Sequence, residues 1–323
     1  MLNNIIFSVN AVFPLVILMI LGFCLKQKKL GLFKNPKEFF NQADRFVFQF
    51  ALPVYVFSEL SGAQIENIFN ANLVIYCMSG LLLSFIIVIL IAPAFIKKRA
   101  SRGAFIQGAC RSNFALLGMP LAGNLFGDIG LKTAALILPF VILLFNTVSV
   151  IVLAVNADYS ENPEKQDTLS RIIGGIIKNP LIIAIIIALP FMIFKISLPT
   201  VVQRSVNYIA NTAAPLALIS LGAGIEPEVL KSKVKLSLIA SILRTIVCPV
   251  VFVIPAVLLG FRDAALVVIF VLFAAPTAVG SYIMAKNMNS DYELAGQIVA
   301  LTTIICPVTV FAGSFILKSM GLI

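Results

Sequence analysis

The sequence predicts an all-α integral membrane protein whose ten transmembrane helices form two inverted five-helix repeats. Three observations support this prediction: the composition, the length of the apolar runs and the distribution of basic residues. The chain has 323 residues, of which 60% are hydrophobic and 12% are charged, and its mean hydropathy is +1.05. These values lie far outside the range of soluble domains. The chain is therefore expected to lie within a lipid bilayer.

Ten apolar runs account for almost the whole chain. A helix needs about 20 apolar residues to cross a hydrocarbon core of about 30 Å. The first run has no basic segment before it and no small-residue cleavage site after it, so it is predicted to be a spanning helix and not a signal peptide. The connections leave little room for a soluble domain. The runs are residues 5–25, 44–61, 71–96, 103–126, 131–156, 179–197, 200–224, 234–260, 263–285 and 292–317.

Basic residues are concentrated in alternate connections between these runs. The connections 26–45, 97–102, 158–178 and 226–235, together with Lys286, contain 17 Lys and Arg, whereas the opposite connections contain five. Cytoplasmic connections carry the excess of basic residues in membrane proteins. The pattern predicts a multi-pass protein of the cell membrane with both termini outside, and it accounts for most of the net charge of +10 without nucleic acid as a partner.

The longest polar connection divides the chain into equal numbers of helices. Residues 158–178 separate a first five-helix repeat, 1–157, from a second, 179–323. Because five is odd, two copies of the unit must insert with opposite orientations, as in many secondary transporters. A weak sequence similarity between residues 51–62 and 213–224 agrees with this arrangement.

The residue types argue against an enzyme and against a metal or cofactor site. The chain has no histidine, which excludes histidine-based catalysis and histidine ligation. Each cysteine stands alone in an apolar run without the spacing of a metal or disulfide pair, and no phosphate-binding GxxxxGK[ST] motif occurs. The cysteines are Cys24, Cys77, Cys110, Cys248 and Cys306.

Two runs are interrupted by proline and glycine at matching positions of the two halves. Gly118 and Pro120 lie in the run 103–126, and Pro276 and Gly280 lie in the run 263–285. Proline frees backbone groups inside the bilayer, which are tolerated only where protein or a water-filled cavity satisfies them. Half-helix N-termini at such breaks suit an anion. These four residues are predicted to form a crossover and hinge; the alternative is ordinary kinks and packing contacts.

Two arginines, Arg111 and Arg244, lie near the middle of their runs. An ionised side chain there costs about 2.5–3.5 kcal/mol on insertion scales. Arg111 lies beside Asn113 in an interrupted helix, so its planar guanidinium could hold a carboxylate. The alternative for both arginines is to cap carbonyls or support helix packing. The candidate substrate-binding residues are Arg111, Ser112, Asn113, Asn146, Pro276 and Thr277.

Two segments resemble the signature regions of the auxin efflux carrier family, which includes plant PIN carriers and bacterial permeases for malate or malonate. They are SNFALLGMPLAGNLFG, residues 112–127, and AAPTAVGSYIMAKNMNSDYELAGQIVALTTIICPVTV, residues 274–310. The resemblance implies a scaffold of the first, second, sixth and seventh helices and a moving transport domain of the others. It also implies that the interrupted helices cross near the substrate and that an elevator-like motion alternates access.

The resemblance also implies roles for single residues. Asn113 would be a substrate-contacting amide, Pro276 the second crossover, and Asn146 the counterpart of a plant glutamine near the carboxylate. Ser112 stands where plant carriers place the crossover proline, so the first break is expected to be looser or displaced toward Pro120. The short connection between the two halves differs from the long plant carriers, and auxin itself is not implied.

The predicted function is secondary active or gradient-driven transport of a small organic anion, such as malate, malonate or an auxin-like acid. The alternative is a sodium- or proton-coupled carrier of another solute on the same fold. Asp44 and Asp263 lie at helix starts, so no buried aspartate pair supports a sodium/proton antiporter. The expected partners are a small carboxylate and the lipid bilayer, with a coupling ion and a homodimer left open.

Overall fold

The computed structural model describes residues 2–27, 32–61, 70–157, 180–224 and 233–323. Within these ranges the chain is helical throughout, apart from short connections and one isolated β-bridge. The predicted all-α class is confirmed, whereas the predicted connection 158–178 lies outside the described residues. Five of the described helical segments are long and apolar enough to cross a membrane: Ile5–Leu25, Ala71–Phe95, Phe114–Val155, Val234–Leu258 and Tyr292–Ser319.

Most helices begin and end close to the limits of the predicted runs. The longest one, α7 (Met119–Val155), contains a kink at Phe126 and Gly127, and Gly127 has a φ of 60° that a residue with a Cβ rarely adopts. The kink separates the fourth and fifth predicted spans. Five other helices agree with their predicted runs: α1 (Leu2–Leu25), α5 (Ala71–Phe95), α9 (Pro180–Ile193), α10 (Thr200–Ala223) and α15 (Tyr292–Ser319).

The second predicted span starts earlier than the sequence indicated. Residues 26–45 were expected to be a connection, but α2 (Pro36–Phe46) occupies its second half and continues through a π-helical turn, η2 (Val47–Ala51), into α3 (Leu52–Ser61). Asn35 accepts a hydrogen bond from the Glu38 amide at the start of α2, a typical N-cap. One face of α2 is buried and the other carries charged residues, so apolar run length alone did not reveal it.

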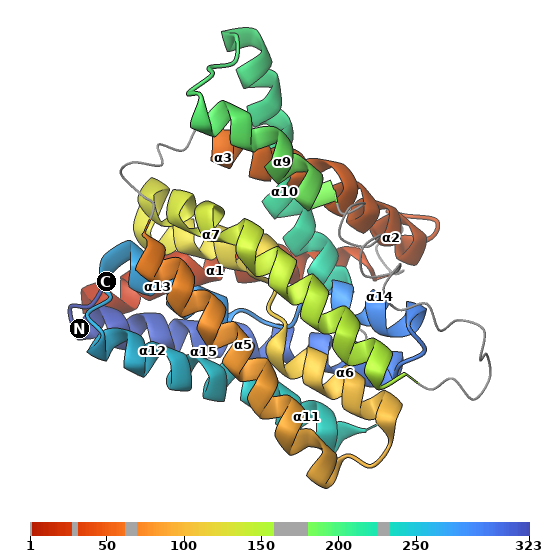
Figure 1. The fold of residues 1–323 in the computed structure, drawn as a ribbon. Helices are drawn as coiled ribbons and strands as arrows, with labels where there is room; N and C mark the ends of the chain where they lie inside the picture. The colour runs from red at the N-terminus through yellow and green to blue at the C-terminus, as the bar shows by residue number, and fades with distance from the viewer. Residues whose placement is uncertain (1, 28–31, 62–69, 158–179, 225–232) are drawn as a thin grey trace.

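The first packing group contains α1, α3, α9 and α10. α1 lies against α10, and α3 lies against both α9 and α10 (Figure 1). A Cβ on Gly22 would lie 1.8 Å from the Ile219 carbonyl oxygen, and a Cβ on Gly222 would lie 1.8 Å from the Met19 carbonyl oxygen. Glycine at both positions therefore lets the backbones of α1 and α10 touch.

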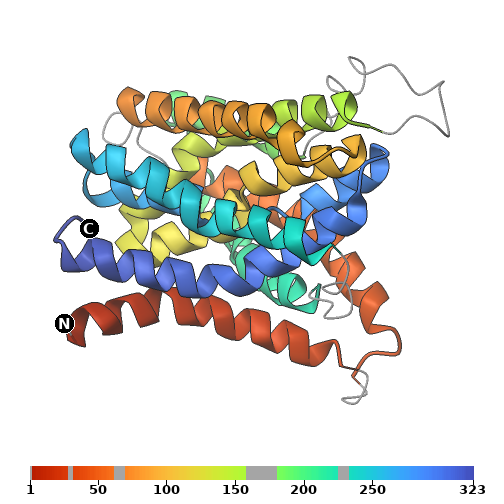
Figure 2. The same cartoon turned by 90° about the horizontal axis from the view of Figure 1, so that it is seen from below.

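The second packing group contains the remaining long helices. α13 (Asp263–Ala274) lies against α7 and α12 (Cys248–Leu258), and α15 lies against α6 (Arg99–Cys110) and α11 (Val234–Ile242). Nearly every residue of α13 is buried, so this short apolar helix runs through protein interior. The helices run side by side in Figure 2, and both views place the two termini at the same end of the bundle.

Candidate functional site

Two helices are interrupted at depth in the second packing group. α6 ends at Cys110, and helical structure resumes with a π-helical turn, η3 (Phe114–Gly118), that leads into α7. α13 ends at Ala274, and α14 (Gly280–Asn287) follows. The two breaks, residues 111–113 and 275–279, thus separate four half-helices.

The two breaks cross and pair with each other. Ser112 and Thr277 form an isolated antiparallel β-bridge. The Asn113 amide donates to the Pro276 carbonyl oxygen at 2.7 Å, and the Ala278 amide donates to the Arg111 carbonyl oxygen at 3.3 Å. Each break thereby supplies hydrogen-bond partners that the other lost on leaving the helix.

The first break falls at Arg111–Asn113, although it contains no proline. Gly118 is the last residue of η3 and Pro120 the second residue of α7, so both lie in the half-helix after the break, and the expected displacement toward Pro120 is absent. The hydrogen bonds between the two breaks satisfy backbone groups of this extended segment. Pro276 lies within the second break, and Gly280 begins α14.

Arg244 lies where the C-terminal ends of α6 and α13 meet. It is completely buried, and its guanidinium donates to the carbonyl oxygens of Cys110 at 3.0 Å, Leu272 at 2.6 Å and Ala275 at 2.9 Å. Helix C-termini carry unpaired carbonyls and partial negative charge. Of the two roles left open by the sequence, Arg244 therefore has the capping role.

The helix that carries Arg244 is not a regular α-helix. A π-helical turn, η6 (Leu243–Val247), joins α11 to α12 and includes the arginine. Single π-helical turns inside α-helices occur frequently at functional sites. The turn thus places an arginine that hydrogen-bonds to both interrupted helices.

Arg111 is the C-cap residue of α6, and its guanidinium lies beside the N-terminal turn of α14. One terminal nitrogen donates to the Asn146 side-chain oxygen at 3.0 Å, and the other contacts the Met284 sulfur. A Cβ on Gly280 would lie 3.7 Å from the guanidinium, so the charge lies beside the first turn of α14. Both partners are neutral, and the positive charge adjoins a helix end that is itself partly positive.

Three buried polar side chains at or beside the crossing have no hydrogen-bond partner in the described structure. They are the Ser112 hydroxyl, the Asn113 amide nitrogen and the Ser281 hydroxyl. An unsatisfied buried polar group costs about 1–3 kcal/mol, and such groups call for an explanation. Next to Arg111, they form a set of potential donors to a bound anion.

Thr277 and Pro276, also predicted to bind substrate, take part in the crossing. The Thr277 hydroxyl donates to the Gly108 carbonyl oxygen at 2.6 Å, and its amide donates to the Thr302 hydroxyl at 3.1 Å. Thr277 is completely buried. Its polar groups thus connect α6, the second break and α15.

Sequence reasoning missed Met284 as a contact of Arg111. The available signal was spacing: Gly280 and Met284 are four residues apart and share one face of a helix. Arg111 and Asn146, each predicted to bind substrate, form a direct hydrogen bond with each other.

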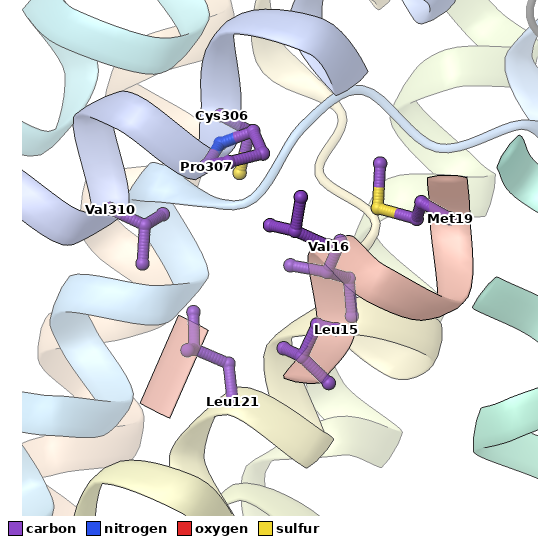
Figure 3. Close-up of a pocket in the computed structure, with 8 residues that line it drawn as sticks. Leu15, Val16, Met19, Leu121, Cys306, Pro307 and Val310 are labelled. Carbon is purple, nitrogen blue, oxygen red and sulfur yellow. The ribbon is translucent and has the colours of Figure 1, made fainter. Parts of the chain in front are cut away.

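An apolar pocket lies between the two packing groups, next to the half-helix that follows Asn113 (Figure 3). Side chains of α1 form one wall, and side chains of η3, α7 and α15 form the others. Leu117 lies one helical turn after Asn113. The lining residues are Leu15, Val16, Met19, Leu117, Leu121, Cys306, Pro307 and Val310.

An apolar helical bundle with two interrupted helices that cross at depth is typical of membrane transporters. The sequence profile described as "Membrane transport protein" matches residues 7–312 of the chain. The chain therefore belongs to this family, which is the auxin efflux carrier family, and it is a membrane transporter.

Named relatives agree with this assignment over nearly their full lengths. The chain is 26% identical to an "Uncharacterized transporter" of Methanocaldococcus jannaschii, covering 91% of this chain and 94% of the relative. It is 24% identical to an "Uncharacterized transporter" of Methanothermobacter thermautotrophicus, with coverage of 96% and 98%. It is 24% identical to a "Putative malonate transporter" of Rhizobium meliloti, with coverage of 89% and 90%. The family and these relatives are transporters, not enzymes.

Proposed function

We propose that the chain transports a small organic anion, a carboxylate such as malate or malonate, across the cell membrane. One observation carries the proposal: Arg111 lies within the crossing and has only the neutral partners Asn146 and Met284 in the described structure. An unpaired charge at membrane depth marks a substrate or ion pathway by default. An arginine selects carboxylates because its planar fork matches the two carboxylate oxygens.

The surroundings of Arg111 favour an anion over any other ligand. The guanidinium lies beside the N-terminal turn of α14, and η3 begins directly after Asn113. Helix N-termini present amides and partial positive charge. The unpaired groups of Ser112, Asn113 and Ser281 add hydrogen-bonding capacity. A carboxylate at this place would neutralise the charge and satisfy these groups.

The relative from Rhizobium meliloti supports the substrate class through its name, which mentions malonate. At 24% identity it is a guide to the class of anion and not to the particular acid. The apolar pocket beside Leu117 is too small for an indole ring. Malonate, malate, citrate and indole acetate form the test panel.

The proposed mechanism is an elevator-type motion of one packing group against the other. The scaffold would contain α1, α2, α3, α9 and α10, and the transport domain would contain the helices around the crossing. Backbone contact at Gly22 and Gly222 supports a rigid scaffold. At the pocket, apolar side chains of α1 face those of η3, α7 and α15, which supports a boundary between the two groups. The hinge role of Gly118, Pro120, Pro276 and Gly280 belongs to this proposal.

The helix contacts also support ten spans in two inverted repeats. In such a chain the first helix corresponds to the sixth and the second to the seventh. The contact of α1 with α10 joins the first and seventh spans, and the contact of α3 with α9 joins the second and sixth. If the first span is replaced by the sixth and the seventh by the second, the contact of α1 with α10 becomes the contact of α9 with α3. A two-fold relation between the repeats requires this correspondence.

The proposed topology places both termini outside, and their position at one end of the bundle supports it. Ser197 is exposed between α9 and α10, and Lys98 is exposed before α6. With the exposed Cys24 changed to serine, Ser197→Cys should react with an impermeant maleimide from outside, and Lys98→Cys only from the cytoplasmic side. The reverse pattern would overturn the topology. A homodimer stays a prediction.

Uptake into proteoliposomes tests the substrate class. Labelled malonate, malate, citrate and indole acetate should be compared with and without imposed sodium or proton gradients. We expect saturable uptake of at least one acid by the wild type, a large loss in Arg111→Gln and a smaller loss in Arg111→Lys. Folded protein that transports none of the acids would favour the alternative, a cation-coupled carrier of another solute.

A further inference from the structure

The guanidinium of Arg244 occupies a place of concentrated partial negative charge. Its three acceptors are backbone carbonyls at the C-terminal ends of both interrupted helices: Cys110 of α6, Leu272 of α13 and Ala275, the C-cap residue of α13. The C-terminal dipole ends of two half-helices point toward it. All three distances, 2.6 to 3.0 Å, are those of hydrogen bonds to a charged donor.

No carboxylate balances this charge in the part of the chain that the structure describes. The titratable neighbours of Arg244 are the thiols of Cys110, Cys248 and Cys306, which are buried and free. The carbonyls alone therefore compensate the arginine. This arrangement resembles an ion-binding site in which the cation is part of the protein.

Transporters with interrupted helices commonly use such a place for a mobile cation. Unwound backbone carbonyls and half-helix C-termini coordinate the coupling ion there, while the N-termini hold the anionic substrate. In this chain the N-terminal side has Arg111 with neutral partners, and the C-terminal side is filled by Arg244. The two functions of the crossing are divided between its two sides.

We propose that Arg244 is a tethered counter-cation that permanently fills the place of a coupling ion, so that anion transport requires no bound sodium. This inference rests on the proposed transport of a carboxylate. Arg244 is then a positioning residue: it fixes the Cys110 carbonyl, directly before Arg111, and thereby sets the geometry of the anion site.

Chemical rescue tests the tethered cation without any substrate. Arg244→Ala should create a cavity that accepts free guanidinium. We expect millimolar guanidinium chloride to raise the melting temperature of this variant in detergent, whereas equal urea, its neutral counterpart in shape, should not. Equal responses to the two solutes, or no response to either, would overturn the proposal.

Arg262→Ala is the matched control for the rescue. Arg262 also caps carbonyls, those of Val257 and Phe261, but at an exposed helix end away from the crossing. Its removal should leave guanidinium without effect on the melting temperature. Rescue of this variant to the same extent would show a nonspecific effect of the salt and count against the tethered cation.

Transport gives the second readout. Wild-type uptake should be equal in sodium, potassium and N-methylglucamine buffers. Arg244→Ala should lose uptake at least tenfold and regain it with guanidinium or sodium. A sodium requirement in the wild type would overturn the proposal. If the wild type carries no tested acid but guanidinium still rescues the melting temperature, the proposed substrate fails and the tethered cation stands.

Arg244→Lys covers the case in which the alanine variant does not fold even with guanidinium present. A lysine keeps a tethered charge with three donors. This variant should fold, transport without sodium and ignore added guanidinium. An unfolded or sodium-dependent lysine variant would contradict the proposal, because charge at this position would then not be sufficient.

Discussion

Arg111 and Arg244 are two arginines at one helix crossing, and their surroundings differ completely. Arg244 is fully enclosed and donates to three backbone carbonyls. Arg111 is partly exposed and has one asparagine and one methionine as side-chain partners. The fold compensates the charge of Arg244 but not the charge of Arg111.

The difference shows that the two sides of an interrupted helix pair favour charges of opposite sign. Both breaks expose C-terminal carbonyls on one side and N-terminal amides on the other. Backbone carbonyls compensate a cation on the carbonyl side. A cation on the amide side adds positive charge to partial positive charge and requires an anion. The same residue type is thus compensated by the fold in one place and left with only neutral partners in the other.

The largest expected difference between the two arginines is in their contribution to the free energy of unfolding. Arg244→Ala should lower the free energy of unfolding by about 3 kcal/mol or more, because three buried carbonyls lose a donor at about 1–3 kcal/mol each. Arg111→Ala should change it by less than about 1 kcal/mol. Unfolding in mixed detergent micelles measures both values. Equal losses would contradict the assigned roles.

The next largest effect is on anion affinity. Arg111→Gln should weaken carboxylate binding about 10- to 100-fold, since a hydrogen bond to a charged group contributes about 1.5–3 kcal/mol. Titration of purified protein with malonate provides the measurement. Arg111→Lys, which keeps the charge without the planar fork, should fall between this variant and the wild type. A loss of stability equal to the loss of affinity would point to a packing role.

A negative charge next to Arg111 should imitate the substrate. Asn146→Asp would turn the present hydrogen bond of 3.0 Å into an ion pair and should weaken anion binding about tenfold, the equivalent of about 1.4 kcal/mol. Asn146→Gln, which is neutral, is the control. Unchanged anion affinity in the aspartate variant would separate Arg111 from the binding site.

A smaller effect is expected at Asn113. Asn113→Ala removes a neutral donor, so affinity should fall only about 2- to 10-fold, in line with about 0.5–1.5 kcal/mol per hydrogen bond. Because the amide nitrogen is buried without a described partner, stability should stay equal or increase. Reduced stability with unchanged affinity in the same titration would indicate a structural amide.

The smallest effect concerns an ion pair away from the crossing. Asp291 accepts from Lys233 at 2.6 Å and from Ser101 at 2.5 Å. Burial raises the pKa of Asp291, but the bonds from Lys233 and Ser101 outweigh it and hold the pKa below its usual value. The ionised pair therefore stabilises the fold above about pH 4, the usual unfolded value, and this contribution is lost as the pH falls through the folded pKa.

Asp291→Asn tests this contribution. At neutral pH the variant should lose less than about 1 kcal/mol of stability, because Lys233 is partly exposed and solvent screens the pair. Its stability should also fall less steeply than that of the wild type in acid. Parallel pH profiles of the two proteins would contradict the ionised pair.

The sequence predicted the helices well because run length and basic connections are local properties. The limits of α1, α5 and α15 lie within a few residues of the predicted runs. It missed α2, whose amphipathic face is too short and too charged to register as an apolar run. The signal of an N-cap at Asn35 followed by Pro36 was present but belonged to the predicted connection.

The candidate site was predicted only in part, because its decisive contacts join distant segments. Proline, glycine and a midplane arginine marked the two breaks. The pairing of Ser112 with Thr277, and the contact of Arg244 with Cys110, bring together residues more than 130 positions apart. Spacing along one helix carries no information on such contacts, so the sequence left both binding and capping open for Arg244.

The pairing of Ser112 with Thr277 also has a consequence for biogenesis. These residues are 165 positions apart, and a membrane chain is synthesised from its N-terminus. The first half enters the bilayer while the backbone partners of its break and the Arg244 cap are not yet made. The candidate site is therefore among the last parts to assemble, and a ribosome-stalled chain that ends before residue 244 contains Arg111 without the contacts that complete its surroundings.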